Sequence, residues 1–163
     1  MAPIVRLTES QLRYLLDVDH ADHEALLAID EDGGEAVGVA RFVRLEEDEG
    51  VAEAAVIVVD SWQGQGLGKA LCLMLAERAR ELGMARFQAT LLLENTAMMS
   101  LLESLGPVET TGREGPAVVV TVELPETGLG DHMEGVLRIA AGGGVEVDPE
   151  TAELGIPDEA GGA

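Results

Sequence analysis

The chain has 163 residues, enough for one domain with a hydrophobic core, and its 31 acidic against 10 basic residues give a formal net charge of −21. Such a charge repels phosphate groups, so we expect no nucleic acid and no membrane surface as a partner, whereas a cationic partner is electrostatically favoured. No segment approaches the roughly 18 apolar residues of a membrane span and the first residues lack a signal-peptide pattern, so we expect a cytoplasmic protein.

A short helix is predicted first, because Ser10 is a favourable N-cap and leucines follow it at helical spacing (Leu12, Leu15 and Leu16). The segment after this helix contains two histidines and two aspartates: Asp19, His20, Asp22 and His23. Their spacing is compatible with metal ligands.

Three strands are predicted next. Residues 24–30 and 35–45 are apolar segments joined by the turn residues of 30–34, which is the pattern of a hairpin. Residues 51–59 form a third apolar segment after another short turn. The simplest arrangement of the three is a meander.

The hydrophobic period then changes to that of a helix. Apolar residues recur at helical spacing over residues 67–82, and Gly83 ends the pattern. A further strand over 85–93 follows, so this helix is expected to form a parallel crossover from the third strand. Cys72, the only cysteine, lies on the helix and is expected to be a buried thiol.

A shorter helix capped by Asn95 and a last strand over 116–124 complete the predicted elements. We expect one domain over residues 1–125 and a docked helix within 126–141. Residues 142–163 contain acids, glycines and prolines but no base, which is typical of a disordered tail.

Three glycines alternate between the third strand and the long helix: Gly64, Gly66 and Gly68. A Walker A loop would need Gly where Gln63 stands and a hydroxyl residue where Ala70 stands. A dinucleotide-binding loop would need Gly where Lys69 stands. Both nucleotide loops are therefore excluded, and a purely structural connection stays an alternative.

The remaining pattern is Gln-x-x-Gly-x-Gly at Gln63, Gly66 and Gly68. It resembles the pyrophosphate loop of the GCN5-related N-acetyltransferase (GNAT) superfamily, whose motif is Arg or Gln, two residues, Gly, one residue, then Gly or Ala. Residues 52–106 reproduce, in order, the superfamily's fourth strand, loop, helix, fifth strand and Asn-led helix. The resemblance is greatest to the acetyltransferase domains of bacterial protein-lysine acetyltransferases.

This resemblance implies an α/β (α+β) fold: a central mixed, mostly antiparallel sheet with a parallel splayed strand pair and flanking helices. It also implies acetyl-CoA as co-substrate and no metal, with the segment before the first strand as an acceptor-side loop. The implied acetyl-CoA contacts are the backbone of Val56, Ile57 and Val58, the loop Gln63, Gly64, Gln65, Gly66, Leu67, Gly68 and Lys69, and Asn95. Glycines let the backbone approach an anion closely, and the amides of the helix N-terminus face it. Asn95 serves equally well as a helix cap.

The implied reaction is direct transfer of acetyl to an amine, which must first lose its ammonium proton. Glu53 is the candidate base, because it lies where many family members keep a catalytic Glu and we expect it to be half-buried. A solvent-facing Glu at the start of a strand is the alternative. Leu102 stands where many members carry a Tyr acid, and Ser100 is a weak substitute. A thiolate leaving group whose pKa is about 8.5 does not strictly require that acid.

The function expected from these observations is N-acetylation of a primary amine, such as a protein lysine or a polyamine-like small molecule. Acidity suits a cationic acceptor, although it is also explained by solubility alone. The alternative is a non-catalytic acyl-CoA-binding or sensor module, which Leu102 and the acidic tail both favour. The protein is expected to be a monomer or a homodimer.

Overall fold

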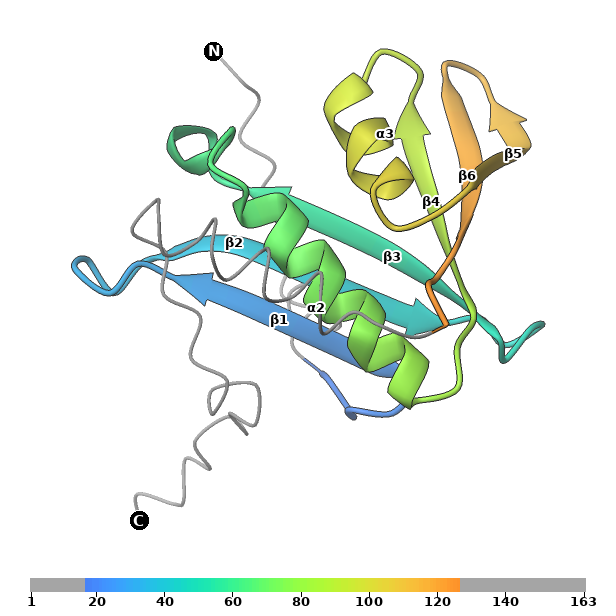
Figure 1. Cartoon of the computed structure of the whole chain (residues 1–163), viewed down its shortest axis with the longest axis horizontal. Coiled ribbons are helices and arrows are strands. Elements are labelled where there is room, and N and C mark those ends of the chain that lie inside the picture. The colour runs from blue at the N-terminus through green and yellow to red at the C-terminus, as the bar shows by residue number, and fades with distance from the viewer. Residues whose placement is uncertain (1–16, 127–163) are drawn as a thin grey trace.

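The computed structural model describes residues 17–126, which form one mixed sheet with helices on one side (Figure 1). The elements in chain order are β1 (His23–Ile29), β2 (Ala36–Arg44), β3 (Val51–Val58), the short 3-10 helix η1 (Asp60–Trp62), α2 (Leu67–Glu81), β4 (Arg86–Leu92), α3 (Thr96–Glu103), β5 (Val108–Glu114) and β6 (Ala117–Glu123). The helix predicted after Ser10, the helix within 126–141 and the acidic tail lie outside the described residues.

The sheet has the strand order β1-β2-β3-β4-β6-β5. β1, β2 and β3 pair antiparallel in sequence order, which confirms the predicted meander. β3 and β4 pair parallel and are connected through α2, which confirms the predicted parallel crossover. The remaining pairs, β4 with β6 and β6 with β5, are antiparallel. The predicted mixed, mostly antiparallel sheet with one parallel pair is therefore confirmed.

The edge strand β5 was not predicted from the sequence. Its sequence, VETTGRE, has no apolar alternation, and most of its side chains are exposed. It pairs only with β6, and the register shifts between Thr110 and Gly112. Charged residues and a bulge are common on edge strands because they discourage pairing with other chains, and the same features hide such a strand from periodicity analysis.

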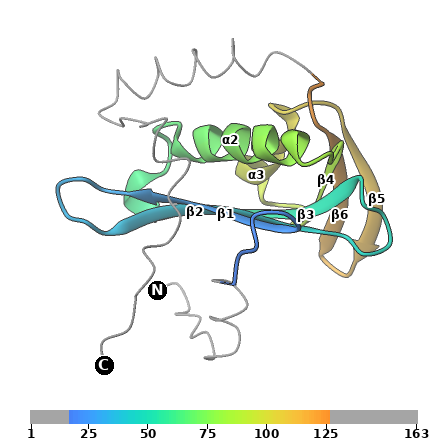
Figure 2. The same cartoon turned by 90° about the horizontal axis from the view of Figure 1, so that it is seen from below.

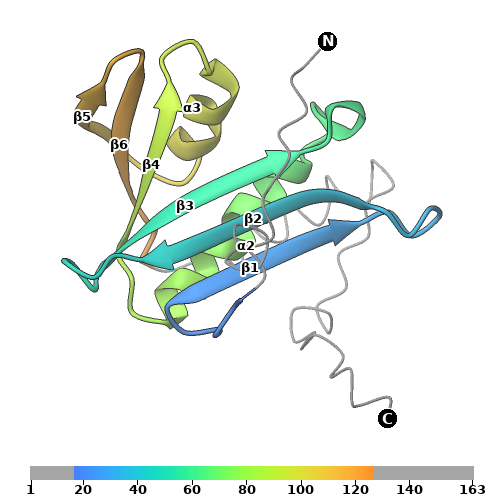
Figure 3. The same ribbon diagram turned by 180° about the vertical axis from the view of Figure 1, so that it is seen from behind.

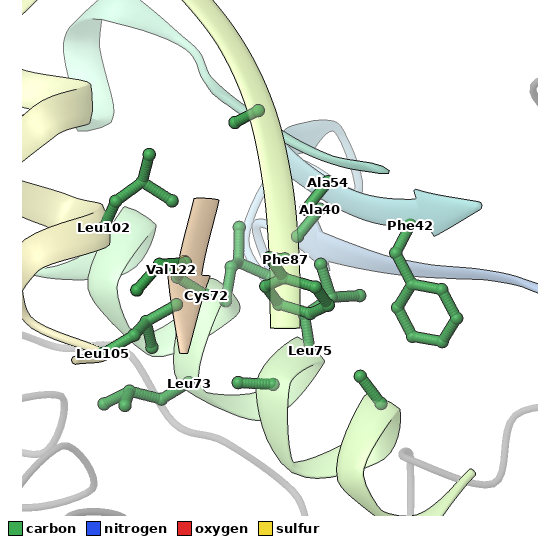
Figure 4. Close-up of a cluster of buried hydrophobic side chains, with 14 of the residues drawn as sticks. Ala40, Phe42, Ala54, Cys72, Leu73, Leu75, Phe87, Leu102, Leu105 and Val122 are labelled. Atoms are coloured by element: carbon green, nitrogen blue, oxygen red, sulfur yellow. The ribbon is translucent and has the colours of Figure 1, made fainter. Parts of the chain in front are cut away.

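The core lies between α2 and the sheet (Figure 2). It is mostly aliphatic, and its two aromatic rings, Phe42 and Phe87, lie with their centroids 6.0 Å apart. Cys72 is buried on α2, and burial raises the pKa of its thiol to about 12. The expectation of a buried thiol is confirmed, and a thiol with such a pKa is a poor nucleophile at neutral pH. Figure 4 shows Cys72 between residues of the sheet and of α3.

The strands β1 to β3 have two different faces. On β3, Ala52 and Ala54 are buried toward α2, whereas Glu53, Ala55 and Ile57 are exposed on the opposite face. We call this second face the outer face. None of the described helices is long and apolar enough to cross a membrane.

Candidate active site

The two parallel strands separate soon after they begin. β3 and β4 pair at only three positions, the last being Glu53 with Gln88. Within the described chain, residues 54–58 of β3 and 89–92 of β4 have no further pairing with each other, and Figure 3 shows the strands diverging from this point. We call the opening between these two segments the wedge. The predicted splayed pair is present, and on this side residues 54–58 of β3 have no partner among the described strands.

The phase of the β2–β3 ladder determines which backbone groups face the wedge. At its two ends, the N–H of Val59 donates to the Val37 carbonyl and the N–H of Leu45 donates to the Val51 carbonyl, both at 2.9 Å. Antiparallel residues alternate between bonding to the neighbouring strand and pointing away from it. Odd-numbered residues of β3 therefore bond to β2. The residues whose N–H and C=O groups point into the wedge are Ala54, Val56 and Val58.

Ile57 differs from its two neighbours in this respect. It pairs with Val39 of β2, so its backbone groups are already used in the ladder. Its side chain is 66% exposed on the outer face. The expected backbone contact to a ligand in the wedge is therefore open to Val56 and to the N–H of Val58, but not to Ile57.

The glycine loop lies at the open end of the wedge, between β3 and α2. Gly64 and Gly66 have φ values of 75° and 86°, in the left-handed region that favours glycine. Gly66 is the N-cap of α2 and has no side chain to bond to the amides of the first turn. Since those amides have no intrahelical acceptor, they are available to an anion.

Two glutamine side chains bond to main-chain carbonyls near this loop. Gln63 Nε2 donates to the Val58 carbonyl at 3.0 Å and to Asp60 Oδ1 at 3.2 Å. Gln65 Nε2 donates to the Ser61 carbonyl at 3.2 Å. Gln63 thus connects the loop to the end of β3, whereas Gln65 bonds only within the connection.

Lys69 is exposed in the first turn of α2 and is the only lysine of the chain. A positive side chain is unfavourable at a helix N-terminus, because the helix dipole is positive there. An anion bound beside Lys69 would offset this cost.

Glu53 lies where the wedge begins, with its side chain on the outer face. It pairs with Val43 on one side and with Gln88 on the other. The side chain is exposed, so the expectation of half burial is wrong. The reason is that Glu53 alternates with the buried Ala52 and Ala54, which places it on the face opposite α2.

The helix α3 follows β4 on the other side of the wedge. Asn95 caps it, its side chain accepting a hydrogen bond from the Met98 N–H at 3.1 Å, which confirms the predicted cap. Leu102 is 1% exposed and packs in the core (Figure 4). Ser100 is exposed. The position of the usual Tyr therefore holds an inward-facing apolar side chain.

The candidate metal ligands before β1 have other partners. Asp19 Oδ1 accepts three backbone N–H groups, from Ala21, Asp22 and His23, at 2.8 to 2.9 Å, and these bonds lower the pKa of its carboxyl group. His20 Nδ1 lies 2.8 Å from Glu24 Oε1, and Asp22 accepts from Arg44 Nε at 2.7 Å. Over residues 17–126 no group of three or more His, Cys, Asp or Glu side chains is arranged to hold a metal ion.

Comparison with known proteins identifies the family. The model of the acetyltransferase (GNAT) family matches residues 3–106, more than half of the chain. The chain belongs to the GNAT acetyltransferase family. The resemblance based on Gln63, Gly66 and Gly68 is thereby confirmed.

Two sequence relatives carry acetyltransferase names. Acetyltransferase Pat of Mycolicibacterium smegmatis is 38% identical over 119 residues, which are 72% of this chain and 35% of that protein. Acetyltransferase PA5475 of Pseudomonas aeruginosa is 32% identical over 108 residues, 65% of this chain and 58% of that protein. The chain thus spans about a third of the length of the Mycolicibacterium relative and somewhat more than half of the length of the Pseudomonas relative.

Solved structures show the same GNAT fold. The GNAT domain of S. lividans PAT has a TM-score of 0.66 at 29% identity, covering 76% of this chain and 73% of that chain. The cAMP-binding acyltransferase from Mycobacterium smegmatis has a TM-score of 0.59 at 31% identity, covering 82% of this chain and 43% of that chain. The predicted fold class is confirmed.

The structure adds three residues that sequence reasoning missed at this site. Ala54 directs its backbone into the wedge, Gln88 lies beside Glu53, and Asp60 accepts from Gln63. Ala54 could have been found from the alternation of backbone hydrogen bonds along β3. One hydrogen bond at the end of the β2–β3 ladder is enough to show which residues point into the wedge. Gln88 follows from placing the parallel strands side by side. The contact of Asp60 depends on the turn of η1, which has no sequence pattern of its own.

Proposed function

We propose that this domain transfers an acetyl group from acetyl-CoA to a primary amine. The observation that supports the proposal most strongly is the wedge, which begins at Glu53 and Gln88 and opens toward a glycine loop at the N-terminus of α2. A pantetheine arm needs an open strand edge with unused donors and acceptors, and a pyrophosphate needs unpaired amides. Both requirements fit the residues present.

In this proposal acetyl-CoA lies in the wedge. Its pantetheine arm bonds to the wedge-facing backbone groups of Val56 and to the N–H of Val58, whose carbonyl already accepts from Gln63. The backbone of Ile57 takes no part, because it pairs with Val39. The pyrophosphate lies over the loop from Gly64 to Lys69. The described contact of Asn95 is its cap bond, and we propose that its amide also approaches the co-substrate.

The proposed chemistry is direct transfer. The neutral amine nitrogen attacks the thioester carbonyl carbon and a carbon–nitrogen bond forms. The nitrogen then releases its second proton to solvent, the carbon–sulfur bond breaks, and CoA leaves as its thiolate. Glu53 accepts the ammonium proton, directly or through a water molecule, before the attack. The buried Leu102 has no proton to give, so the thiolate takes its proton from solvent, which its pKa of about 8.5 permits.

The proposed acceptor is cationic, such as a protein lysine or a polyamine-like small molecule. Two features support it: the net charge of −21 and the exposed Glu53 on the outer face. An ammonium group is attracted by such a field and is then deprotonated at the carboxylate. We propose the cytoplasm as the setting of this reaction.

The test is incubation with acetyl-CoA and a panel of lysine peptides, polyamines and neutral amines, with release of free CoA thiol as the readout. We expect thiol release with at least one cationic amine and less with neutral ones of similar size. Saturable CoA binding without thiol release for any acceptor would contradict an enzyme.

A non-catalytic acyl-CoA-binding module is the second candidate, favoured by the burial of Leu102 where many relatives have an acid. It predicts that acetyl-CoA raises the melting temperature while no thiol is released. The same panel therefore separates the two functions.

A further inference from the structure

Gln63 makes two side-chain hydrogen bonds at the end of β3. Its amide nitrogen lies 3.0 Å from the Val58 carbonyl oxygen and 3.2 Å from Asp60 Oδ1. Both partners are acceptors, a carbonyl and a carboxylate, so it is the NH₂ group of Gln63 and not its oxygen that faces them. The side chain therefore folds back on the protein although it is exposed.

This arrangement uses both hydrogens of the Gln63 amide. A primary amide has two N–H donors and one carbonyl acceptor. With one donor on Val58 and the other on Asp60, only the oxygen remains, and an oxygen does not bind a phosphate. Gln63 in this position has no donor left for a pyrophosphate.

The two acceptors that Gln63 contacts precede the proposed pyrophosphate loop in the chain. The Val58 carbonyl is the last wedge-facing carbonyl of β3, and Asp60 opens the turn that leads into the glycine loop. Unshielded, a carbonyl dipole and a carboxylate at this place would both repel a pyrophosphate. The carboxylate carries a full charge, so its contribution would be the larger one.

We propose that Gln63 is a positioning residue: it shields the Val58 carbonyl and the Asp60 carboxylate and attaches the glycine loop to β3, without touching the co-substrate. The inference rests on the proposed function and assigns a role to Gln63, the first residue of the glycine motif. We expect Gln63 to affect the binding of acetyl-CoA and not the proton transfer. Its partners are distant along the chain from the proposed base Glu53, which precedes Val58 by five residues on β3.

The test compares Gln63→Leu with Gln63→Arg and with Thr111→Val. Leucine has a similar size but no donor, so we expect the KM for acetyl-CoA to rise about tenfold while kcat stays within about threefold. Arginine supplies N–H donors and should keep the KM within about threefold of the wild type. Thr111→Val is the control, because Thr111 also bonds from its side chain to a main-chain carbonyl, that of Val119 at 3.4 Å, but lies on β5, which β4 and β6 separate from β3. The KM of this variant should change by less than about twofold.

A double-mutant cycle distinguishes shielding from direct contact. If Gln63 acts through Asp60, the penalty of Gln63→Leu should be at least about threefold smaller in an Asp60→Ala background. Unchanged melting temperatures of the variants would show that folding is not responsible. Additive penalties, or equal effects of Gln63→Leu and Thr111→Val, would overturn the inference.

The outcome for Gln63 is separable from the outcome for the proposed function. If the wild type binds CoA but transfers no acetyl group, the proposed function fails, and the same variants are compared by the Kd for CoA from calorimetry. The expected order is then the same, with Gln63→Leu weakest. Absence of CoA binding by the wild type would overturn both.

Discussion

The position of Glu53 bears on its proposed role as the proton acceptor. It is the last residue of β3 that pairs with β4, and its side chain is exposed to solvent on the outer face. The neighbouring Ala52 and Ala54 are buried and cannot move protons. Glu53 is thus the carboxylate of β3 on which the proposed mechanism depends.

We expect Glu53→Gln to lower kcat about 100-fold at neutral pH, because a positioned general base contributes about 10²- to 10⁴-fold. The KM for acetyl-CoA should change little, since the amide has the same shape and is not at the loop. Steady-state thiol release as a function of pH is the measurement, and the residual rate should rise with pH as free amine accumulates. Glu109→Gln, on the edge strand β5, is the control. Full activity of Glu53→Gln would remove the proposed base.

Replacing Lys69 should weaken the binding of CoA without lowering the stability of the fold. Lys69→Gln removes a cation from the first turn of α2, where it opposes the helix dipole, so stability should stay equal or rise by about 0.3 to 1 kcal/mol. The Kd for CoA should nevertheless rise severalfold. Thermal melting and calorimetry of the same variant measure both, and Lys69→Arg should retain wild-type affinity. Loss of stability together with affinity would indicate a structural role instead.

The stability contributed by Asp19, in the loop before β1, should depend on pH. Its pKa is lowered by the backbone N–H groups that it accepts, chiefly that of Ala21, so the ionised form is favoured in the folded state. The resulting stabilisation is complete above the ordinary value of 3.8 and is lost as the pH falls through the lower folded value. We expect Asp19→Ala to cost about 1 kcal/mol at pH 7, as loss of a comparable cap does, and the difference to shrink toward pH 2.5. Urea unfolding at both pH values is the measurement. A difference that does not change with pH would contradict the role of the charge.

The connection between β3 and α2 depends on glycines for two different reasons. Gly66 needs its left-handed φ of 86°, whereas Gly68 lies inside the helix. A Cβ at Gly68 would lie 3.4 Å from Leu101 Cδ1 and 3.6 Å from Val58 Cγ2, which is ordinary van der Waals contact.

Replacing the two glycines by alanine should therefore have opposite effects. Gly66→Ala forces a left-handed residue that costs about 1 to 2 kcal/mol, and a loop that relaxes out of this shape should raise the KM for acetyl-CoA about tenfold or more. Gly68→Ala should leave the KM within about threefold and raise stability by about 0.5 to 1 kcal/mol, because alanine is the better helix former. Melting curves and KM values for both variants check this. A larger loss from Gly68→Ala than from Gly66→Ala would contradict it.

Periodicity predicted the elements that have a buried face. The leucines of α2 recur at helical spacing, and the apolar segments of β2, β3 and β6 are long enough to recognise, so these elements were found within one or two residues. β5 was missed because an edge strand with exposed side chains needs no apolar pattern.

The site was predictable where it depends on local chain geometry. The glycine motif identified the loop, and a cap residue identified the start of α3. The exposure of Glu53 and the use of the Ile57 backbone were not predictable in this way. The first depends on which face of β3 packs against α2, and the second on the ladder phase between β2 and β3. The two hydrogen bonds at the ends of that ladder are long-range contacts that a local pattern does not contain.

The net charge of the whole chain acts on both proposed substrates over a long range. At −21 the protein repels CoA, itself a polyanion, and attracts a cationic amine. The local loop amides and Lys69 act in the opposite direction on CoA, but only over a short range. The two contributions differ in range, and salt therefore separates them, because the Debye length falls from about 30 Å at 0.01 M to about 8 Å at 0.15 M.

We expect the two substrates to respond to salt with opposite signs. Between about 0.01 and 0.15 M NaCl the Kd for CoA should fall, because long-range repulsion is screened before the contacts at the loop are. Over the same range the KM for a cationic acceptor such as spermidine should rise, because the attraction is screened, and the KM for a neutral amine should stay constant. Calorimetry and thiol-release kinetics in a salt series measure the three dependences, and Lys69→Gln should retain the fall in the Kd for CoA. A Kd for CoA that rises monotonically with salt would mean that the loop and Lys69 outweigh the net charge even at long range.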